Sequence, residues 1–284
     1  MKRIVLLFAC AAACKSAPAP APTAAAPAGN ARATAAAVVA APDRDPADLK
    51  LDPGRKPAEM LEFLGVKPGM KVEDMGAGGG YTTELLARAV APGGVVYMQN
   101  DPRWMSFLKD AIAKRFTHPA MKDVVRADVP FDEPIPQGVS GLDLVVLNVI
   151  YHDIANMPVD RVRMNEIVFN ALKPGGAFVV IDSSAKAGSG VSATQSLHRI
   201  DEEVVKQELE KAGFKLAQEG DFLRNPDDTR DWNSSPQAAE KAGKRGQSDR
   251  FALKFVRPQG SRAQIIPPHL RLPEGPAPSR VTAE

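Results

Sequence analysis

Apolar and polar positions follow two alternating periods along the middle of the chain. Short continuous apolar runs, typical of strands buried on both faces, alternate with stretches whose apolar residues recur every three or four positions, as on one face of a helix. The runs predict seven strands, at residues 70–75, 95–99, 124–125, 142–149, 177–181, 214–218 and 251–256. The helical period predicts helices at residues 57–64, 81–90, 104–116, 164–172 and 204–212. Alternation of this kind predicts an α/β domain, at residues 46–257, with a mostly parallel seven-stranded sheet and helices on both faces.

One connection in this pattern is unusually long. Residues 225–248 are polar and separate the last two predicted strands. A connection of this length is either a surface excursion or a lid over a site, and the sequence leaves both open. The stretch 173–176, Lys-Pro-Gly-Gly, is expected to turn the chain into the fifth strand.

The two ends of the chain differ in composition from the middle. Many of the 25 prolines lie there, and residues 15–45 and 258–284 show no amphipathic period. Segments of this composition cannot bury enough apolar surface to offset the entropy lost on ordering. We therefore expect residues 15–45 to be a disordered Ala/Pro-rich linker and residues 258–284 to be a disordered Pro-rich tail.

Residues 1–14 have the pattern of an export signal. Two basic residues precede an apolar stretch at 4–13 that is too short to span a bilayer as a helix. Small residues precede both Cys10 and Cys14, which resembles a bacterial lipoprotein leader, in which the cysteine after the cut is lipidated. Cys14 leaves an apolar region of better length, whereas Cys10 has the better large residue three positions upstream; a plain secretory signal is the alternative. The sequence predicts an exported protein, periplasmic or anchored to a bacterial membrane through Cys14, or else through Cys10.

Composition narrows the partners. Hydrophobic residues make up 44% of the chain and charged residues 25%, as in ordinary soluble globular proteins, and the formal net charge is +2. Basic residues are scattered, so nucleic acid is not an expected partner. Both cysteines lie within the leader, which excludes a disulfide or thiolate metal site within the rest of the chain. We expect a small-molecule substrate and no metal site, and the sequence does not reveal the oligomeric state.

A glycine-rich run lies between the first predicted strand and the following helix. It reads DMGAGGG at residues 74–80. Glycines let the backbone turn tightly and approach a ligand closely, and the helix start offers free N–H groups to it. The dinucleotide pattern G-x-G-x-x-G would need a glycine where this chain has Tyr81, which disfavours a nicotinamide-dependent oxidoreductase.

The observed pattern, D-x-G-x-G-x-G, supports a family resemblance. The segment VEDMGAGGGY at residues 72–81 resembles the first motif of class I S-adenosylmethionine-dependent methyltransferases. The stretch LKPGG at residues 172–176 is similar to a second landmark of that superfamily. The resemblance covers roughly residues 46–257 and is nearest to a poorly characterised group of bacterial methyltransferases with exported members. It implies the Rossmann-like class I methyltransferase fold, S-adenosylmethionine as cofactor, and methyl transfer to an acceptor that the sequence does not name.

The resemblance also implies roles for the glycine run. Asp74 would act on the methionine end of the cofactor, at its amino group, through water or backbone. The positions that would let the loop pass beneath the ligand are Gly76, Ala77, Gly78 and Gly80.

Two further strand ends match cofactor-binding positions. The family normally offers an acid to the ribose hydroxyls after the second strand, where this chain has Asn100 and then Asp101. An asparagine lacks the charge-assisted strength of a carboxylate, and Asp101 is the alternative. After the third strand, Asp128 and Val129 match the positions that contact adenine, and a turn cap is the other interpretation of Asp128.

Candidate chemistry follows the fourth strand. Open parallel sheets bind ligands at the carboxyl ends of their strands, and a methyltransferase mainly positions the nucleophile and removes a proton where one must leave. His152 can titrate near neutral pH, and Asp153 would orient it or act as a base itself. Tyr151 is the third catalytic candidate, and Asn148 is a candidate for cofactor binding. The alternative is a hydrogen-bonded loop that caps the following helix.

Weaker candidates lie further along. Asp182 follows the fifth strand, and His198 and Arg199 would reach across the cleft to an acidic substrate group. Asp201 is most simply a helix N-cap. The acidic residues of 224–228 lack partner ligands, so we expect a turn there.

A second function stays open at this point. S-adenosylmethionine is made and used mainly inside cells, whereas the leader directs the chain outward, and Asn100 departs from the acid that the family has. An exported, non-catalytic ligand-binding protein that retains the methyltransferase fold is therefore the alternative to an enzyme, because a fold alone does not establish an activity.

Overall fold

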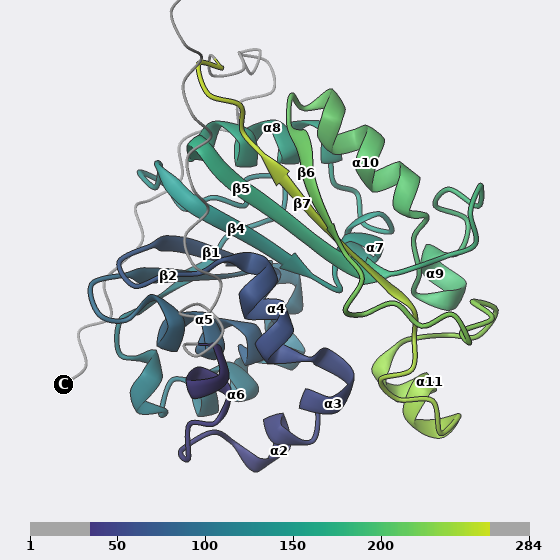
Figure 1. The fold of residues 1–284 in the computed structure, drawn as a ribbon, viewed down its shortest axis with the longest axis horizontal. Helices are drawn as coiled ribbons and strands as arrows, with labels where there is room; N and C mark the ends of the chain where they lie inside the picture. The colour runs from purple at the N-terminus through teal and green to yellow at the C-terminus, as the bar shows by residue number, and fades with distance from the viewer. Residues whose placement is uncertain (1–34, 262–284) are drawn as a thin grey trace, which may run out of the picture.

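The computed structural model describes residues 35–261, and its strands form one sheet (Figure 1). The strands are β1 (Lys71–Met75), β2 (Val95–Asn100), β3 (Val124–Asp128), β4 (Leu142–Asn148), β5 (Leu172–Ser183), β6 (Lys215–Gly220) and β7 (Arg250–Val256). Their order is β3-β2-β1-β4-β5-β7-β6. The first five strands pair in parallel, and β7 pairs antiparallel with β5 and β6. The predicted mostly parallel seven-stranded sheet is confirmed.

Helices cover both faces of the sheet. They are α2 (Pro46–Leu49), α3 (Asp52–Arg55), α4 (Pro57–Leu64), α5 (Tyr81–Val90), α6 (Met105–Arg115), α7 (Tyr151–Ile154), α8 (Arg161–Ala171), α9 (Thr194–Leu197), α10 (Glu202–Lys211) and α11 (Pro236–Lys241), with 3-10 turns η1 (Pro102–Trp104) and η2 (Pro119–Met121). Apolar residues of α4, α5 and α6 form one buried cluster with the sheet, and those of α7, α8 and α10 form another. No helix among the described residues is both long and apolar enough to cross a membrane.

Strand β4 shows why an unbroken apolar run marks a central strand. Leu144 and Val146 belong to the cluster on one face of the sheet, and Val145 and Leu147 belong to the cluster on the other. Successive side chains of a strand point to opposite faces, so a strand covered on both sides needs apolar residues at every position. This central position also brings the carboxyl end of β4 next to that of β1, with which it pairs.

The Lys-Pro-Gly-Gly stretch differs from its expectation. It lies inside β5 rather than in a separate turn. Gly175 donates a backbone hydrogen bond to the carbonyl of Arg257, and Arg257 donates one to the carbonyl of Gly176, at 2.7 and 2.9 Å. The ladder therefore continues through the stretch because the chain after β7 supplies its backbone partners, which the local sequence does not reveal.

The packed chain also begins earlier than predicted. Residues 35–39 are helical, and Ala35 and Val38 are buried against the domain. Arg44 is only 5% exposed and forms an ion pair with Asp52 at 2.6 Å. The end of the expected linker is therefore packed on the domain. Its apolar side chains and its ion pair find partners in distant segments, which composition alone does not show. Residues 1–34 and 262–284, which include the expected export signal and almost all of the expected tail, lie outside the described residues.

Candidate functional site

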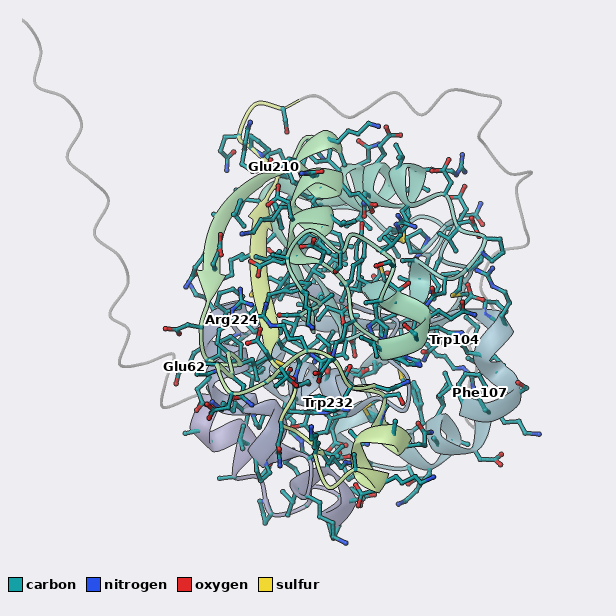
Figure 2. All side chains as sticks on the ribbon, turned by 90° about the vertical axis from the view of Figure 1, so that its right-hand side faces the viewer. Glu62, Trp104, Phe107, Glu210, Arg224 and Trp232 are labelled. Carbon is teal, nitrogen blue, oxygen red and sulfur yellow. The ribbon has the colours of Figure 1, made fainter. Side chains whose placement is uncertain are left out.

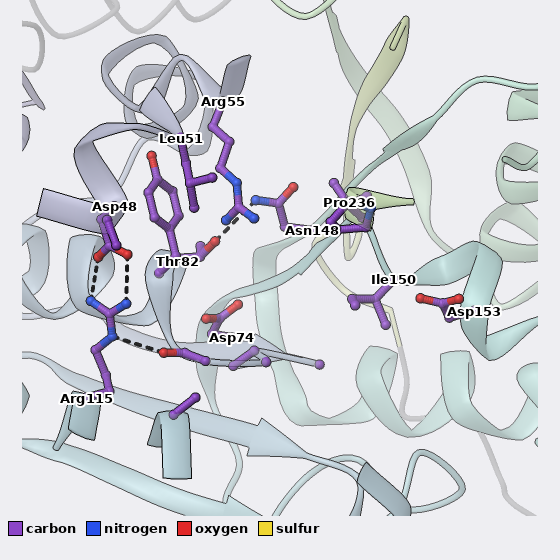
Figure 3. A pocket seen from close by; sticks show the side chains of 18 of the residues that line it. Asp48, Leu51, Arg55, Asp74, Thr82, Arg115, Asn148, Ile150, Asp153 and Pro236 are labelled. Atoms are coloured by element: carbon purple, nitrogen blue, oxygen red, sulfur yellow. Dashed lines mark hydrogen bonds and ion pairs between the residues drawn. The ribbon is translucent and has the colours of Figure 1, made fainter. Parts of the chain in front are cut away.

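A cavity of about 760 Å³ opens at the carboxyl ends of β1 and β4 (Figure 3). Its lining comes from the glycine loop and the start of α5, from α2, α3 and α6, from the segments after β4 and α9, and from residues 234–237. Ligands of open parallel sheets bind at this edge, and the volume suits a small molecule. The sequence-predicted residues that line it are Asp74, Gly76, Ala77, Gly78, Asn148, His152, Asp153 and His198.

Two segments far apart in the chain meet beside the cavity. Gly54 of α3 packs so closely on Gly246 that a Cβ at Gly54 would lie 2.7 Å from the Gly246 Cα. Arg250 donates a hydrogen bond to the carbonyl of Gly54 at 2.6 Å. The long 225–248 connection, which the sequence left as an excursion or a lid, therefore contributes residues 234–237 to the cavity wall and contacts α3 through Gly246.

The spacing of the glycine loop has a steric explanation. Gly76, Gly78 and Gly80 all have φ in the left-handed region, at 66°, 56° and 83°. A Cβ would come within 2.9 Å of Ile150 at Gly76 and within 2.9 Å of Arg115 at Gly80, but would meet nothing within 4 Å at Gly78. Packing and backbone conformation thus require the outer two glycines. At Gly78 only the left-handed backbone conformation favours glycine, and the space around its Cα is open to the cavity.

The side chain of Asn100 is hydrogen-bonded to the backbone of the glycine loop. Its side-chain oxygen accepts a hydrogen bond from the Gly78 N–H at 2.8 Å, and its side-chain N–H donates to the Gly78 carbonyl at 3.1 Å. The neighbouring Gln99 accepts from the Gly76 N–H at 2.8 Å. A carboxylate at position 100 could accept but not donate. An asparagine in place of the family's acid therefore makes both hydrogen bonds to Gly78. Asn100 is 1% exposed and does not line the cavity.

Other predicted cofactor contacts also lie outside the cavity lining. Asp101 is buried, pairs with Arg103 at 2.6 Å and accepts from the Phe131 N–H at 2.9 Å. Asp128 pairs with the neighbouring Arg126 at 2.7 Å. The backbone carbonyl of Val129 accepts from Gln99, and Gly80 contacts Arg115 and Met98 rather than open space. The structure uses these groups to hold the loop and the strand ends in place.

Asp74 lines the cavity and is almost completely buried. It is 1% exposed, and one carboxylate oxygen accepts a hydrogen bond from the Thr83 hydroxyl at 2.6 Å. Burial raises its pKa to about 7, against the opposing effects of the Thr83 bond and the positive charge of Arg55. Asp74 is therefore an acid that titrates near neutral pH on the cavity surface.

Arg55 is a cavity residue that the sequence did not single out. Its guanidinium points into the cavity near Asn148 (Figure 3) and lies 4.3 Å from the ring centroid of Tyr81. Within the described part of the chain it makes no hydrogen bond or ion pair, and burial lowers its pKa. A cation and a carboxyl group therefore line the same cavity. No local pattern marks Arg55, because its position depends on α3 folding over the glycine loop.

A strained residue directs the chain from β4 into α7. Val149 has φ of 62°, which is costly for a β-branched side chain, and its N–H donates to the Ile181 carbonyl at 2.7 Å. The turn brings His152 against Asp182 at the end of β5. The His152 backbone N–H donates to one oxygen of Asp182 at 2.9 Å, and its Nδ1 lies 2.7 Å from the other. The strained backbone at Val149 therefore lies directly before the residues after β4 that line the cavity.

The Asp182 carboxylate sets the state of the His152 ring. Both side chains are buried. Burial alone would lower the pKa of His152, but the adjacent charge and hydrogen bond of Asp182 raise it above the ordinary value. Because the carboxylate accepts at Nδ1, that nitrogen carries the hydrogen in the neutral ring and Nε2 faces the other way. The two residues, each a separate candidate in the sequence, thus act as one unit.

His198 completes a group at this end of the cavity. One carboxylate oxygen of Asp153 lies 3.4 Å from His152 Nε2 and 3.4 Å from His198 Nδ1. The two imidazole rings are 5.4 Å apart and inclined at 77°. The expected role of Arg199 is wrong, because its fully buried side chain pairs with Asp228 at 2.7 Å instead of reaching the cavity.

Two more sequence expectations are decided by local contacts. Tyr151 does not reach the cavity: it is fully buried, donates to Glu208 at 2.6 Å and accepts from Asn165 at 2.9 Å. Asp201 is the N-cap of α10, as predicted, and accepts from the Glu203 N–H. Neighbouring positions in a short helix face different directions, so only His152 and Asp153 of the three catalytic candidates line the cavity.

The cavity lining also includes an exposed aromatic side chain. Phe107 of α6 lines the cavity but is 66% exposed, at the molecular surface in Figure 2. Large apolar side chains exposed singly are common, but this one borders a cavity and offers a flat face to a planar ligand.

Comparisons with known proteins agree with this architecture. Residues 54–119 match the profile of the protein-L-isoaspartate(D-aspartate) O-methyltransferase family. A solved S-adenosylmethionine-dependent methyltransferase from Aquifex aeolicus is 20% identical, with 75% of this chain and 93% of that chain covered and a TM-score of 0.51. A Galdieria sulphuraria protein named as a sarcosine dimethylglycine methyltransferase is 16% identical, with 73% and 86% covered and a TM-score of 0.51. No curated protein matches the sequence. The strand order, the glycine loop and these likenesses show that the described chain has the Rossmann-like fold of the class I, S-adenosylmethionine-dependent methyltransferases.

Proposed function

We propose that the protein is an S-adenosylmethionine-dependent methyltransferase that acts on a small-molecule acceptor. The observation that carries this proposal is the pair of opposite charges beside the glycine loop. Asp74 and Arg55 both line the cavity, and the charge of each acts on the other's pKa. The methionine part of the cofactor is a zwitterion, with an ammonium and a carboxylate group on one carbon. Arg55 is the partner for the carboxylate and Asp74 for the ammonium.

The rest of the cavity accommodates the rest of the cofactor. The open space at Gly78 lets the ligand lie against the loop backbone, and Phe107 offers its ring face to the adenine. The group formed by His152, Asp153 and His198 remains for the acceptor. Methyl transfer from a sulfonium needs an aligned nucleophile more than it needs strong acid or base catalysis, so a polar group that orients the acceptor is sufficient.

Calorimetric titration of the purified protein with S-adenosylmethionine and S-adenosylhomocysteine tests the proposal. Arg55→Gln should weaken binding of either ligand by roughly 10- to 100-fold, because a hydrogen bond to a charged group contributes about 1.5–3 kcal/mol. Lys215→Gln is the matched control, since it removes the same charge from an exposed position on β6. Absence of binding by the natural protein at millimolar ligand, or equal weakening by both variants, would refute this assignment.

A non-catalytic binding protein is the alternative that the predicted export signal favours. Both proposals predict cofactor binding, so binding cannot separate them. Incubation with S-adenosylmethionine and a broad panel of small-molecule acceptors separates them, because an enzyme releases S-adenosylhomocysteine in proportion to acceptor. Binding with no release over the whole panel would support the non-catalytic protein and contradict the enzyme.

A further inference from the structure

We propose that His152, Asp153 and His198 form a binding site for a divalent transition-metal ion, with Zn²⁺ as the test ion. The sequence pattern predicted no metal site, because these residues come from two short segments separated by more than forty positions. The structure brings them together: one ligand atom from each lies within 4.8 Å of the other two. Two imidazoles and one carboxylate are a donor set that such ions prefer.

The distances fit a shared ion. Four ligands arranged tetrahedrally at about 2.1 Å from Zn²⁺ lie about 3.4 Å from one another. Asp153 Oδ1 is 3.4 Å from His152 Nε2 and 3.4 Å from His198 Nδ1. These separations exceed the 2.7 Å between His152 Nδ1 and Asp182. A carboxylate that faces two imidazole nitrogens at ligand–ligand distance, with neither in a short hydrogen bond, is arranged for a cation between the three.

The surroundings of His152 are those of a metal ligand. Its Nδ1 is bonded to the fully buried Asp182, which also accepts from the backbone N–H groups of His152 and Ser183. Metal-bound histidines commonly donate their second ring N–H to a carboxylate, which fixes the ring and leaves the lone pair of the other nitrogen on the metal. Here that nitrogen is Nε2, the atom that faces Asp153.

His198 is held by the cavity wall. It has φ of 50°, in the left-handed region, directly after α9. Its carbonyl accepts a hydrogen bond from the Ser234 hydroxyl at 2.6 Å, and Ser234 itself lines the cavity. The 225–248 connection thereby fixes the third ligand as well as bordering the cavity.

Three protein ligands leave a coordination position open. All three line the cavity, and the side chains of Asp153 and His198 are about one-third exposed. An open position of this kind is typical of catalytic rather than structural zinc sites. It would take water or an oxygen donor of the acceptor, and this last statement rests on the proposed function, whereas ion binding does not.

Calorimetric titration with Zn²⁺ tests the site in the full chain after chelator treatment, with Cys10 and Cys14 replaced by serine so that no thiol contributes. The natural triad should bind one equivalent. His198→Ala and Asp153→Asn should each weaken binding by at least about 100-fold, and Asp182→Asn by roughly 10- to 100-fold because it only positions His152. His118→Ala is the matched control. His118 lines the same cavity but lies 2.8 Å from Glu84, so its loss should leave Zn²⁺ affinity within about 3-fold.

Two results would overturn the site: no binding by the natural triad at millimolar Zn²⁺, or equal binding by His198→Ala, Asp153→Asn and His118→Ala. Circular dichroism melts of each variant establish that loss of binding is not loss of fold. Titration of the same preparations with S-adenosylmethionine keeps the two proposals apart, because failure of cofactor binding with intact Zn²⁺ binding refutes only the methyltransferase.

Discussion

Asp74→Asn should change how the stability of the protein depends on pH. The natural carboxyl group is buried, and its pKa rises from 3.8 to about 7 in the folded state. The folded state therefore holds this proton more tightly than the unfolded state, and unfolding releases it. The free energy of unfolding must then fall as pH rises from about 4 to about 7, and change little above that. Asparagine has a similar shape and does not titrate, so the variant lacks this contribution.

The size of the effect follows from the shift. A difference of about 3 pH units at 1.36 kcal/mol each gives about 4 kcal/mol over the whole range. About 2 kcal/mol of this falls between pH 5.5 and pH 8, because only about 1.5 pH units at 1.36 kcal/mol each separate pH 5.5 from the folded-state pKa of about 7. The natural protein should lose about 2 kcal/mol of stability relative to the variant over that interval. Titrating groups that do not interact with Asp74 are common to both proteins and cancel in the comparison. The buried Glu73 is the exception, because the Asp74 charge raises its pKa and the variant removes that effect.

Urea denaturation followed by circular dichroism at several pH values measures this difference. Asp123→Asn is the matched control, because its side chain is 73% exposed and its substitution should leave the pH dependence unchanged. A part of the stability difference that does not change with pH reflects the packing of the amide. If the whole difference between Asp74→Asn and the natural protein is independent of pH over this range, the conclusion that Asp74 titrates near neutral pH is contradicted.

Three further predictions concern the cavity and the leader. Cofactor affinity should rise from about pH 5.5 to about pH 7.5 as Asp74 ionises, and calorimetry should find no such rise in Asp74→Asn. Gly78→Ala should cost only about 1–2 kcal/mol of stability, since its methyl group meets no neighbour, yet should weaken cofactor binding by more than about 10-fold; unchanged affinity would mean that the ligand does not lie against the loop. The predicted lipid anchor at Cys14 should label the protein with radioactive palmitate in a bacterial host, and Cys14→Ser should abolish the label; labelling that is unchanged in the variant would exclude a lipid anchor at that cysteine.

Much of the fold could be predicted because its signals are local. The continuous apolar run of β4 and the three- and four-residue spacing in α5 each reflect which faces of one element are buried. The glycines at 76, 78 and 80 were predictable for the same reason, since each left-handed backbone conformation belongs to one residue. General rules of chain connection then predicted a mostly parallel sheet, whereas the strand order and the antiparallel pairing of β7 came from the structure.

The site depended on contacts between distant segments. Only the tertiary structure placed the guanidinium of Arg55 in the same cavity as Asp74, joined His152 to Asp182, and brought His198 to Asp153. The structure alone also showed that Asn100 bonds to the loop backbone instead of lining the cavity.

The sequence by itself thus determined the sheet, the helices and the loop that a ligand would contact, because periodicity and glycine spacing encode backbone conformation within one element. The tertiary structure decided which side chains line the cavity and which lie in the core. Those positions depend on how α3, α7, α9 and the 225–248 connection are placed relative to one another. A local sequence pattern does not specify which distant residue a side chain contacts.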